Sequence, residues 1–166
     1  MTLRTEKGFT LIEVVVVVAI IGIIIPALTM TVIALLTNSQ QANNHNIALQ
    51  QVQNTGYWIS HDVQMANNVS FDDPSGFPIT LGIPVDTDEN NDITVQYLFD
   101  GNKLKRWAYD SQGTLVSESL TADYLDVANT TFSTLDSTTY SLTVAVSSGE
   151  VTVERSYEVS QRPSSS

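Results

Sequence analysis

An acidic segment in the middle of the chain is the first place where residue types and spacing point to chemistry. Its oxygen-bearing side chains alternate at Asp86, Asp88, Asn90 and Asp92. Carboxylate and amide oxygens in this pattern are typical of the first half of a calcium-binding loop. The segment is not an EF-hand, because Asn91 stands where the loop needs glycine and Tyr97 where it needs a bidentate glutamate. A looser calcium site and a plain solvated acidic loop are both open interpretations.

The two histidines do not predict a zinc site. His45 and His61 lie sixteen residues apart in a segment expected to be helical, and the chain has no cysteine to help them bind zinc. No glycine-rich phosphate loop and no Gly-x-Ser-x-Gly elbow occurs. We therefore expect both histidines on a polar helix face, and we expect a protein that is not an enzyme and has no cofactor apart from the calcium considered above.

The charge balance narrows the range of partners. The net charge is −11 at pH 7, and the chain has only seven lysines and arginines. No basic patch can form to neutralise phosphates, so nucleic-acid binding is not expected. The acidic remainder is rich in Thr, Ser, Asn and Asp, which suits a soluble domain that faces outward. A domain of this size can bury a core without disulfides.

A long apolar segment dominates the N-terminal part of the chain. Residues Val14–Leu36 would span roughly 35 Å as a helix at ~1.5 Å per residue, enough to cross a hydrocarbon core of ~30 Å. Arg4 and Lys7 precede the segment, which predicts a cytoplasmic N-terminus and an extracytoplasmic C-terminal part. We expect a single-pass protein of the cytoplasmic membrane that contacts lipid through residues 11–36.

Three interpretations of this segment compete. A secretory signal peptide is supported by Val32-Ile33-Ala34, which resembles a cleavage site, but the apolar run is too long for one. A plain membrane anchor explains the length. It does not explain Glu13, because a carboxylate near the start of a spanning helix is costly unless it meets a partner. The third interpretation depends on the residues around Gly8.

The hexapeptide Gly8-Phe9-Thr10-Leu11-Ile12-Glu13 follows a short basic leader and closely resembles the processing motif of type IV prepilins and type II secretion pseudopilins. In that family a prepilin peptidase cuts after the glycine and methylates the new N-terminus. The resemblance implies a leader peptide of residues 1–8, cleavage between Gly8 and Phe9, and N-methylation of Phe9. It also implies two kinds of partner, the peptidase and other pilin or pseudopilin subunits.

Glu13 matches the glutamate found in that family five residues into the mature chain, and the resemblance implies a role in assembly. In a filament, the α-amino group of Phe9 in an adjacent subunit can supply the positive charge that a carboxylate needs in an apolar bundle. Charge pairing there falls off with distance, so the pair could fix the axial register of an incoming subunit. The alternative is a glutamate at the membrane interface that points into the headgroups.

The helix is expected to have two parts, a transmembrane and filament-core part at 9–36 and an amphipathic part at 37–70. Gly22 and Pro26 are expected to interrupt the first part, because proline removes a backbone donor. Apolar residues of the second part recur at spacings of three and four, which predicts one stripe packed on the protein's own sheet. The stripe comprises Leu49, Val52, Gly56, Ile59, Val63 and Ala66.

Residues 71–161 are expected to form a β-rich head. Alternation over Ile93–Phe99, followed by the turn signal Asp100-Gly101-Asn102, predicts a hairpin. Further strands are expected at Leu115–Ser119, Thr130–Leu135, Tyr140–Ser147 and Val151–Val159, with a second hairpin turn at Ser148-Gly149. Residues 162–166 are expected to be a disordered tail. The result is an α+β fold, with a long helix packed on an antiparallel sheet.

Two segments also resemble, more weakly, the J-type minor pseudopilins. One is Trp58–Ala66, and the other combines Ile93–Tyr97 with Leu104–Arg106. Together with the N-terminal motif they predict a minor structural subunit of a type IV pilus-like or type II secretion filament in the cell envelope. The alternatives are a major pilin of an adhesive or motility pilus, and a membrane-tethered extracellular binding module or enzyme.

Calcium binding at Asp86–Asp92 is testable by calorimetry. Titration of the soluble part, from about Asn38 onward, should show heat of binding that Asp88→Ala weakens, because the substitution removes a carboxylate ligand. Calcium should also raise the melting temperature of the same protein. An absence of heat at millimolar calcium, with an unchanged melting temperature, would leave only the solvated acidic loop.

Overall fold

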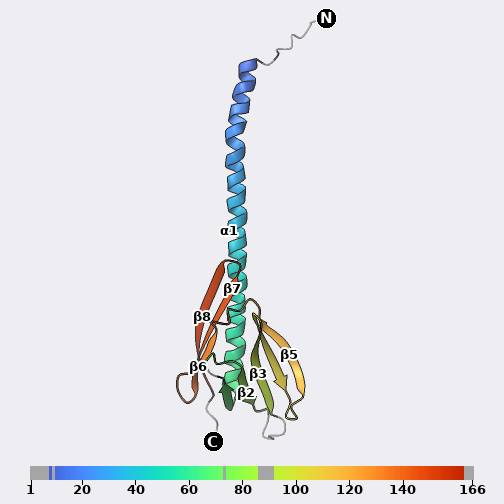
Figure 1. The fold of residues 1–166 in the computed structure, drawn as a ribbon, viewed down its shortest axis with the longest axis vertical. Helices are drawn as coiled ribbons and strands as arrows, with labels where there is room; N and C mark the ends of the chain where they lie inside the picture. Colours follow the sequence, from blue (N-terminus) through green and yellow to red (C-terminus); the bar gives the residue numbers. More distant parts are fainter. Residues whose placement is uncertain (1–7, 9, 73, 86–91, 163–166) are drawn as a thin grey trace. The chain divides into compact units, whose positions relative to one another are not determined.

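The computed structural model describes residues 8, 10–72, 74–85 and 92–162. The chain divides into two compact units, Met1–Gln40 and Gln41–Ser166, and each is described by itself. One helix, α1 (Leu11–Met65), contributes to both units (Figure 1). All described strands belong to the second unit, which we call the head.

The described strands of the head form two antiparallel sheets. They are β1 (Asn68–Phe71), β2 (Ile79–Ile83), β3 (Ile93–Asp100), β4 (Lys103–Tyr109), β5 (Leu115–Ala122), β6 (Thr131–Thr134), β7 (Thr139–Ser148) and β8 (Val151–Ser160). The first sheet has five strands in the order β1-β2-β3-β4-β5, and the second has three in the order β6-β7-β8. The expected α+β class is confirmed, although the head holds two sheets rather than one.

The core of the head lies around the second part of α1, which has the β6–β8 sheet on one side and the β2–β5 strands on the other in Figure 1. The predicted helical stripe is the buried face: Val52, Ile59 and Val63 are fully buried. They share one apolar cluster with fully buried side chains of both sheets, among them Leu81, Val95, Leu104, Leu142 and Val144. Burial of this stripe orients the helix against the sheets.

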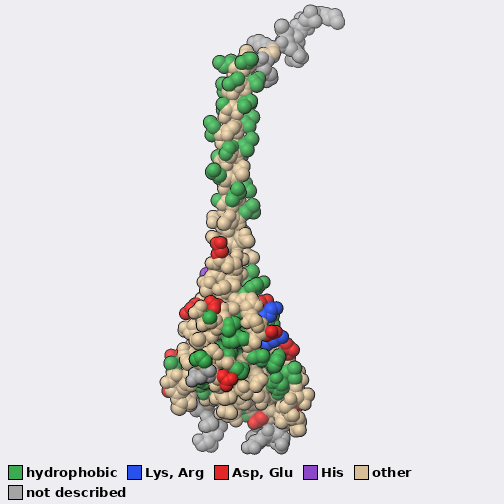
Figure 2. Space-filling model, viewed as in Figure 1, with side chains coloured by type: hydrophobic (Ala, Val, Ile, Leu, Met, Phe, Trp, Pro, Cys, Tyr) green, Lys and Arg blue, Asp and Glu red, His purple; other side chains and the backbone are tan. Residues whose placement is uncertain are grey.

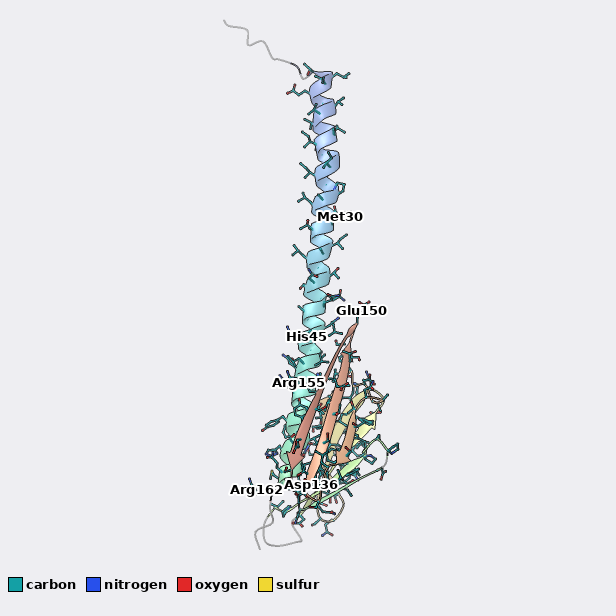
Figure 3. The ribbon with its side chains drawn as sticks, turned by 90° about the vertical axis from the view of Figure 1, so that its left-hand side faces the viewer. Met30, His45, Asp136, Glu150, Arg155 and Arg162 are labelled. Atoms are coloured by element: carbon teal, nitrogen blue, oxygen red, sulfur yellow. The ribbon has the colours of Figure 1, made fainter. Side chains whose placement is uncertain are left out.

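Both predicted hairpin turns are present. Asp100 pairs with Lys103 across a two-residue loop in which Gly101 has a φ of 62°. Ser148 pairs with Val151 across Gly149, whose φ is 60°, and Glu150 lies at this turn (Figure 3). Glycine adopts positive φ at little cost, which is why it stands at the first position of each loop.

The amphipathic helix ends at Met65 and not at residue 70. The N–H of Ala66 donates to the carbonyl of Val63 at 3.2 Å, a tightened final turn. The N–H of Asn67 then donates to Gly82 at 2.9 Å, and β1 pairs with β2 from Asn68 onward. Asn67 and Asn68 favour caps and turns over helix, and pairing with β2 satisfies the backbone that leaves the helix.

Two further expectations differ from the structure. The helix continues without interruption through Gly22 and Pro26. The missing N–H of Pro26 leaves only the Gly22 carbonyl without its usual donor, and a single lost bond does not end a long helix. At the other end, Arg162 is not part of a free tail, because its N–H donates to the carbonyl of Gln64 at 3.3 Å. The remaining tail residues, 163–166, lie outside the described part.

Close packing at Gly56 gives a stability prediction. A Cβ there would overlap the ring of Tyr157, whose hydroxyl donates to the carbonyl of Val52 at 3.2 Å. Helix propensity alone favours Gly56→Ala by about 1 kcal/mol. The overlap with the Tyr157 ring should outweigh this gain, so that Gly56→Ala destabilises the head by about 1–2 kcal/mol. Urea denaturation of the detergent-solubilised protein measures this free energy of unfolding.

Two comparisons isolate the cause. Gly82→Ala is the matched control, because a Cβ there meets its nearest neighbour, Asn68 Cβ, at an ordinary 3.6 Å. It should leave stability unchanged or slightly increased. In a Tyr157→Ala background, Gly56→Ala should become stabilising. If it stays destabilising there, the Tyr157 ring is not what excludes a side chain at Gly56.

Candidate functional site

The N-terminus of α1 is capped by Thr10. The N–H of Glu13 donates to the Thr10 carbonyl at 3.1 Å and to Thr10 Oγ1 at 3.4 Å. Thr10 and Glu13 have the spacing of a capping box, and a carboxylate in the first turn is favoured by the helix dipole. The Thr-x-x-Glu pattern therefore marks the start of the helix, although both bonds to Thr10 come from the backbone of Glu13 and not from its carboxylate.

Gly8 precedes this cap and is exposed. No described atom lies within 4 Å of the position that a Cβ at Gly8 would occupy. Crowding within the described chain therefore does not explain the glycine. Phe9, predicted to be the first residue after cleavage, lies outside the described residues.

The first part of α1 is apolar on all sides. Exposed large apolar residues are Leu11, Ile12, Val14, Val15, Val16, Val17, Val18, Ile20, Ile21, Ile23, Ile24, Ile25, Leu28, Met30, Val32, Ile33, Leu35 and Leu36. Figure 2 shows these hydrophobic side chains along the helix, and Met30, which is 72% exposed, points outward in Figure 3. By length and composition, α1 can cross a membrane. A helix that is apolar all round needs an apolar environment such as lipid or a protein bundle.

Hydroxyl groups in this part of α1 are satisfied within the helix. Thr29, Thr31 and Thr37 donate to the carbonyls of Ile25, Ala27 and Ile33 at 2.9, 2.9 and 3.0 Å. Such bonds remove the cost of placing a hydroxyl in lipid. The threonines therefore do not interfere with the apolar character of the surface.

Charged residues occur only at the two ends of α1. No Asp, Glu, Lys or Arg occurs between Glu13 and Asp62. The ion pairs of the described residues do not include Glu13. Asp62, in contrast, is paired with Arg106 inside the head. Of the two carboxylates of the helix, only that of Asp62 therefore has a described cation beside it.

Asp62 is held by a buried cluster that joins α1 to β3 and β4. Its side chain is 3% exposed, and its Oδ2 accepts from Tyr97 Oη at 2.6 Å and from Arg106 Nε at 2.7 Å. Tyr97 and Arg106 face each other in the β3–β4 register. The Arg106 guanidinium also lies 5.7 Å from the ring centre of Trp58. One carboxylate thus links the end of the helix to two strands.

The electrostatics of this cluster favour the charged pair. Burial, and then the neighbouring Asp62 carboxylate, raise the pKa of the Tyr97 phenol far above its ordinary value, so the phenol stays a donor. Burial opposes the charge on Arg106, but the hydrogen bond and the charge of Asp62 outweigh it and raise the pKa of the guanidinium. The cluster is a structural ion pair, and we assign it no chemistry.

The described residues that were considered for metal binding are His45, His61 and Asp92. His45 and His61 are exposed on α1, where His61 stacks on Tyr57 with ring centres 5.9 Å apart. Of the calcium candidates, Asp86, Asp88 and Asn90 lie outside the described residues, and Asp92 is half-buried just before β3. Among the described residues no group of three His, Asp or Glu side chains could hold a metal. Calcium binding therefore stays a prediction.

Comparison with known proteins identifies the N-terminal segment. Residues 3–25 match the family model described as the prokaryotic N-terminal methylation motif. The match supports the resemblance to type IV pilins and pseudopilins, implies processing by a prepilin peptidase and supports a membrane-anchored N-terminus. It points to a structural protein, and it covers none of the head. No curated protein and no solved structure matches the chain.

The buried pair gives a sharp stability prediction. Arg106→Met should cost about 3–5 kcal/mol in the free energy of unfolding, because it leaves the Asp62 charge buried without a cation. The double variant Asp62→Leu with Arg106→Met should recover most of that loss. Lys103→Met on the same strand is the matched control: its pair with Asp123 is half-exposed at 3.7 Å and should contribute no more than about 1 kcal/mol. Equal losses for Arg106→Met and Lys103→Met would contradict this account.

Proposed function

We propose that this protein is a structural subunit of a type IV pilus-like or type II secretion filament, processed by a prepilin peptidase and assembled through the first part of α1. One observation carries the proposal. A methylation motif at residues 3–25 leads directly into a helix that is apolar on all sides and whose first turn bears a carboxylate. An anchor alone would need the apolar surface but neither the motif nor the charge.

Processing is proposed to occur between Gly8 and Phe9. Glycine lets a peptidase approach the backbone closely because it has no side chain. Gly8 is exposed, and no described atom lies near the position of a Cβ there, so packing within the chain does not require a glycine. This supports a requirement set by a partner such as the peptidase. Arg4 and Lys7 in the leader favour a cytoplasmic N-terminus with the acidic head on the other side of the membrane.

Assembly is proposed to depend on the charge of Glu13. In an apolar bundle a carboxylate is costly unless a cation meets it. Cleavage after Gly8 would create an α-amino group at Phe9, and the amine of a neighbouring subunit would pair with Glu13. Glu13 also stands at the capping-box position, so its role as a cap must be separated from its role as a charge.

A minor rather than a shaft subunit is our proposal for the head. The two segments that resemble J-type minor pseudopilins meet at the Asp62 cluster, where Asp62 contacts Tyr97 and Arg106. This contact supports treating the two segments as one shared feature. A shaft subunit would dominate a sheared-filament preparation, and finding this protein as its main component would favour the major-pilin alternative.

Processing is tested by intact-mass analysis of the protein purified from membranes of its native host. The mass should correspond to a chain that begins at Phe9 and carries one added methyl group. Gly8→Val should abolish the shift and leave the full-length chain in the membrane, because the side chain blocks the close approach. A chain that begins at Leu35 would instead indicate signal-peptidase cleavage after Ala34.

The role of Glu13 is tested with two substitutions in a strain that lacks the native copy. Glu13→Gln keeps a side chain that can complete a capping box, yet removes the charge. Glu13→Val removes both. If the charge pair sets register, both variants should insert in the membrane and be cleaved, and both should be lost from sheared filaments.

Membrane level, processing and filament incorporation are measured together for each variant. Normal incorporation of Glu13→Gln with failure of Glu13→Val would show that Glu13 acts as a helix cap. Normal assembly of both would remove the pairing role altogether. Loss of either protein from the membrane would point to insertion instead of subunit docking.

A further inference from the structure

The outer face of the five-stranded sheet carries a group of polar and aromatic side chains that the proposed function does not use. Strand alternation turns Val95, Tyr97 and Ala108 toward the core, where they are buried. Their neighbours Thr94, Gln96, Trp107 and Tyr109 must point to the opposite face, and all four are half-buried. We call these four residues, with Asp92 and Asp110, the outer-face site.

The β3–β4 register brings these side chains together. Gln96 lies opposite Trp107, and Thr94 lies opposite Tyr109. The two rings meet edge to face, with centres 6.5 Å apart and planes at 84°. The indole Nε1 of Trp107 is buried and has no hydrogen-bond partner within the described chain, so Trp107 supports the ring of Tyr109 from beneath and offers no donor to a ligand. The strands therefore present two adjoining aromatic rings beside an amide and a hydroxyl.

An open surface hollow of about 500 Å³ lies beside Tyr109. Its described lining residues are Asp92, Thr94, Gln96, Tyr109, Asp110, Ser111 and Gly113. The hollow is open to solvent, so a ligand would lie along the surface of the sheet and would not be enclosed. Two lining groups are held in place: Gln96 Nε2 donates to Thr80 Oγ1 at 3.3 Å, and Asp110 Oδ1 accepts the N–H groups of Gln112 and Thr114 at 2.9 and 2.8 Å.

The chemistry of the lining selects the ligand class. The described lining has carboxylates, hydroxyls and an amide but no lysine or arginine, so an anion is disfavoured. A single metal ion would fill only a small part of this hollow, and Asp110, one of its two described carboxylates, already accepts two backbone N–H groups. A sugar has hydroxyls for the polar groups and a C–H face for the ring of Tyr109, the aromatic residue among the described lining residues. We propose that the outer-face site binds a neutral saccharide.

The site is tested on the full chain in phosphocholine-headgroup micelles, since a sugar-headgroup detergent would compete. The chain has two tryptophans, so Trp58→Phe leaves Trp107 as the sole indole reporter. Cellohexaose, chitohexaose and maltohexaose are titrated in turn, and trilysine serves as the cationic probe. At least one oligosaccharide should change the Trp107 fluorescence saturably, with a dissociation constant near or below about 1 mM.

Three variants in that background locate the binding. Tyr109→Ala and Gln96→Leu should each weaken it about tenfold, or ~1.4 kcal/mol, whereas Tyr109→Phe keeps the ring and should stay close to the parent. Tyr57→Ala, which removes a tyrosine of α1 that is 63% exposed and lies outside the outer-face site, should have no effect. Thermal melting of each variant separates lost binding from lost folding.

Two outcomes would overturn the proposal. One is the absence of saturable change with all three oligosaccharides while the melting temperature is normal. The other is saturation by trilysine alone, which would make the site a cation pocket. Neither outcome bears on filament assembly, because the outer-face site and Glu13 are tested by different measurements.

Discussion

A carboxylate that leaves water is costly unless it meets a positive charge, and this constraint fixes the end of α1 that lies in the head. At Asp62 the chain meets it internally, since Arg106 and Tyr97 converge on one oxygen at 2.7 and 2.6 Å. At Glu13, in contrast, the ion pairs of the described residues include no cation, and the helix that follows is apolar on all sides. The first carboxylate fixes the fold of one molecule. The second is the point at which, in the proposed function, one molecule depends on another.

The requirement at Asp62 also constrains the sheets. Tyr97 and Arg106 can reach the same oxygen only if β3 and β4 are paired in their observed register, because a slip by one residue would turn one of them to the outer face. The apolar stripe of α1 sets the depth of packing, but apolar contacts alone tolerate small shifts. A short, buried, directional contact specifies one arrangement among several of similar burial.

Much of the fold was predictable from local pattern. The helical stripe through Val52, Ile59 and Val63 and both glycine turns followed from period and turn chemistry. The end of the helix did not, because the stripe continues to Ala66 while the backbone has already turned toward β2. β2 was missed although Ile79, Leu81 and Ile83 alternate. Five residues give little periodic signal, and this strand is defined by its neighbours. The buried partners of Asp62 lie 35 and 44 residues away along the chain, so no local pattern could identify them.

The all-apolar surface of α1 has a consequence for the reversibility of the proposed assembly. Lipid tails are as apolar as valine and isoleucine, so a helix that moves from bilayer to filament core gains little from the hydrophobic effect. The solvation free energy of the helix surface therefore changes little when a subunit enters the filament or leaves it. The balance between growth and retraction then depends on small terms such as close helix packing and one charge pair. In the proposed filament, withdrawal of a subunit would then require only modest work, and the subunit would return to the membrane without exposing this surface to water.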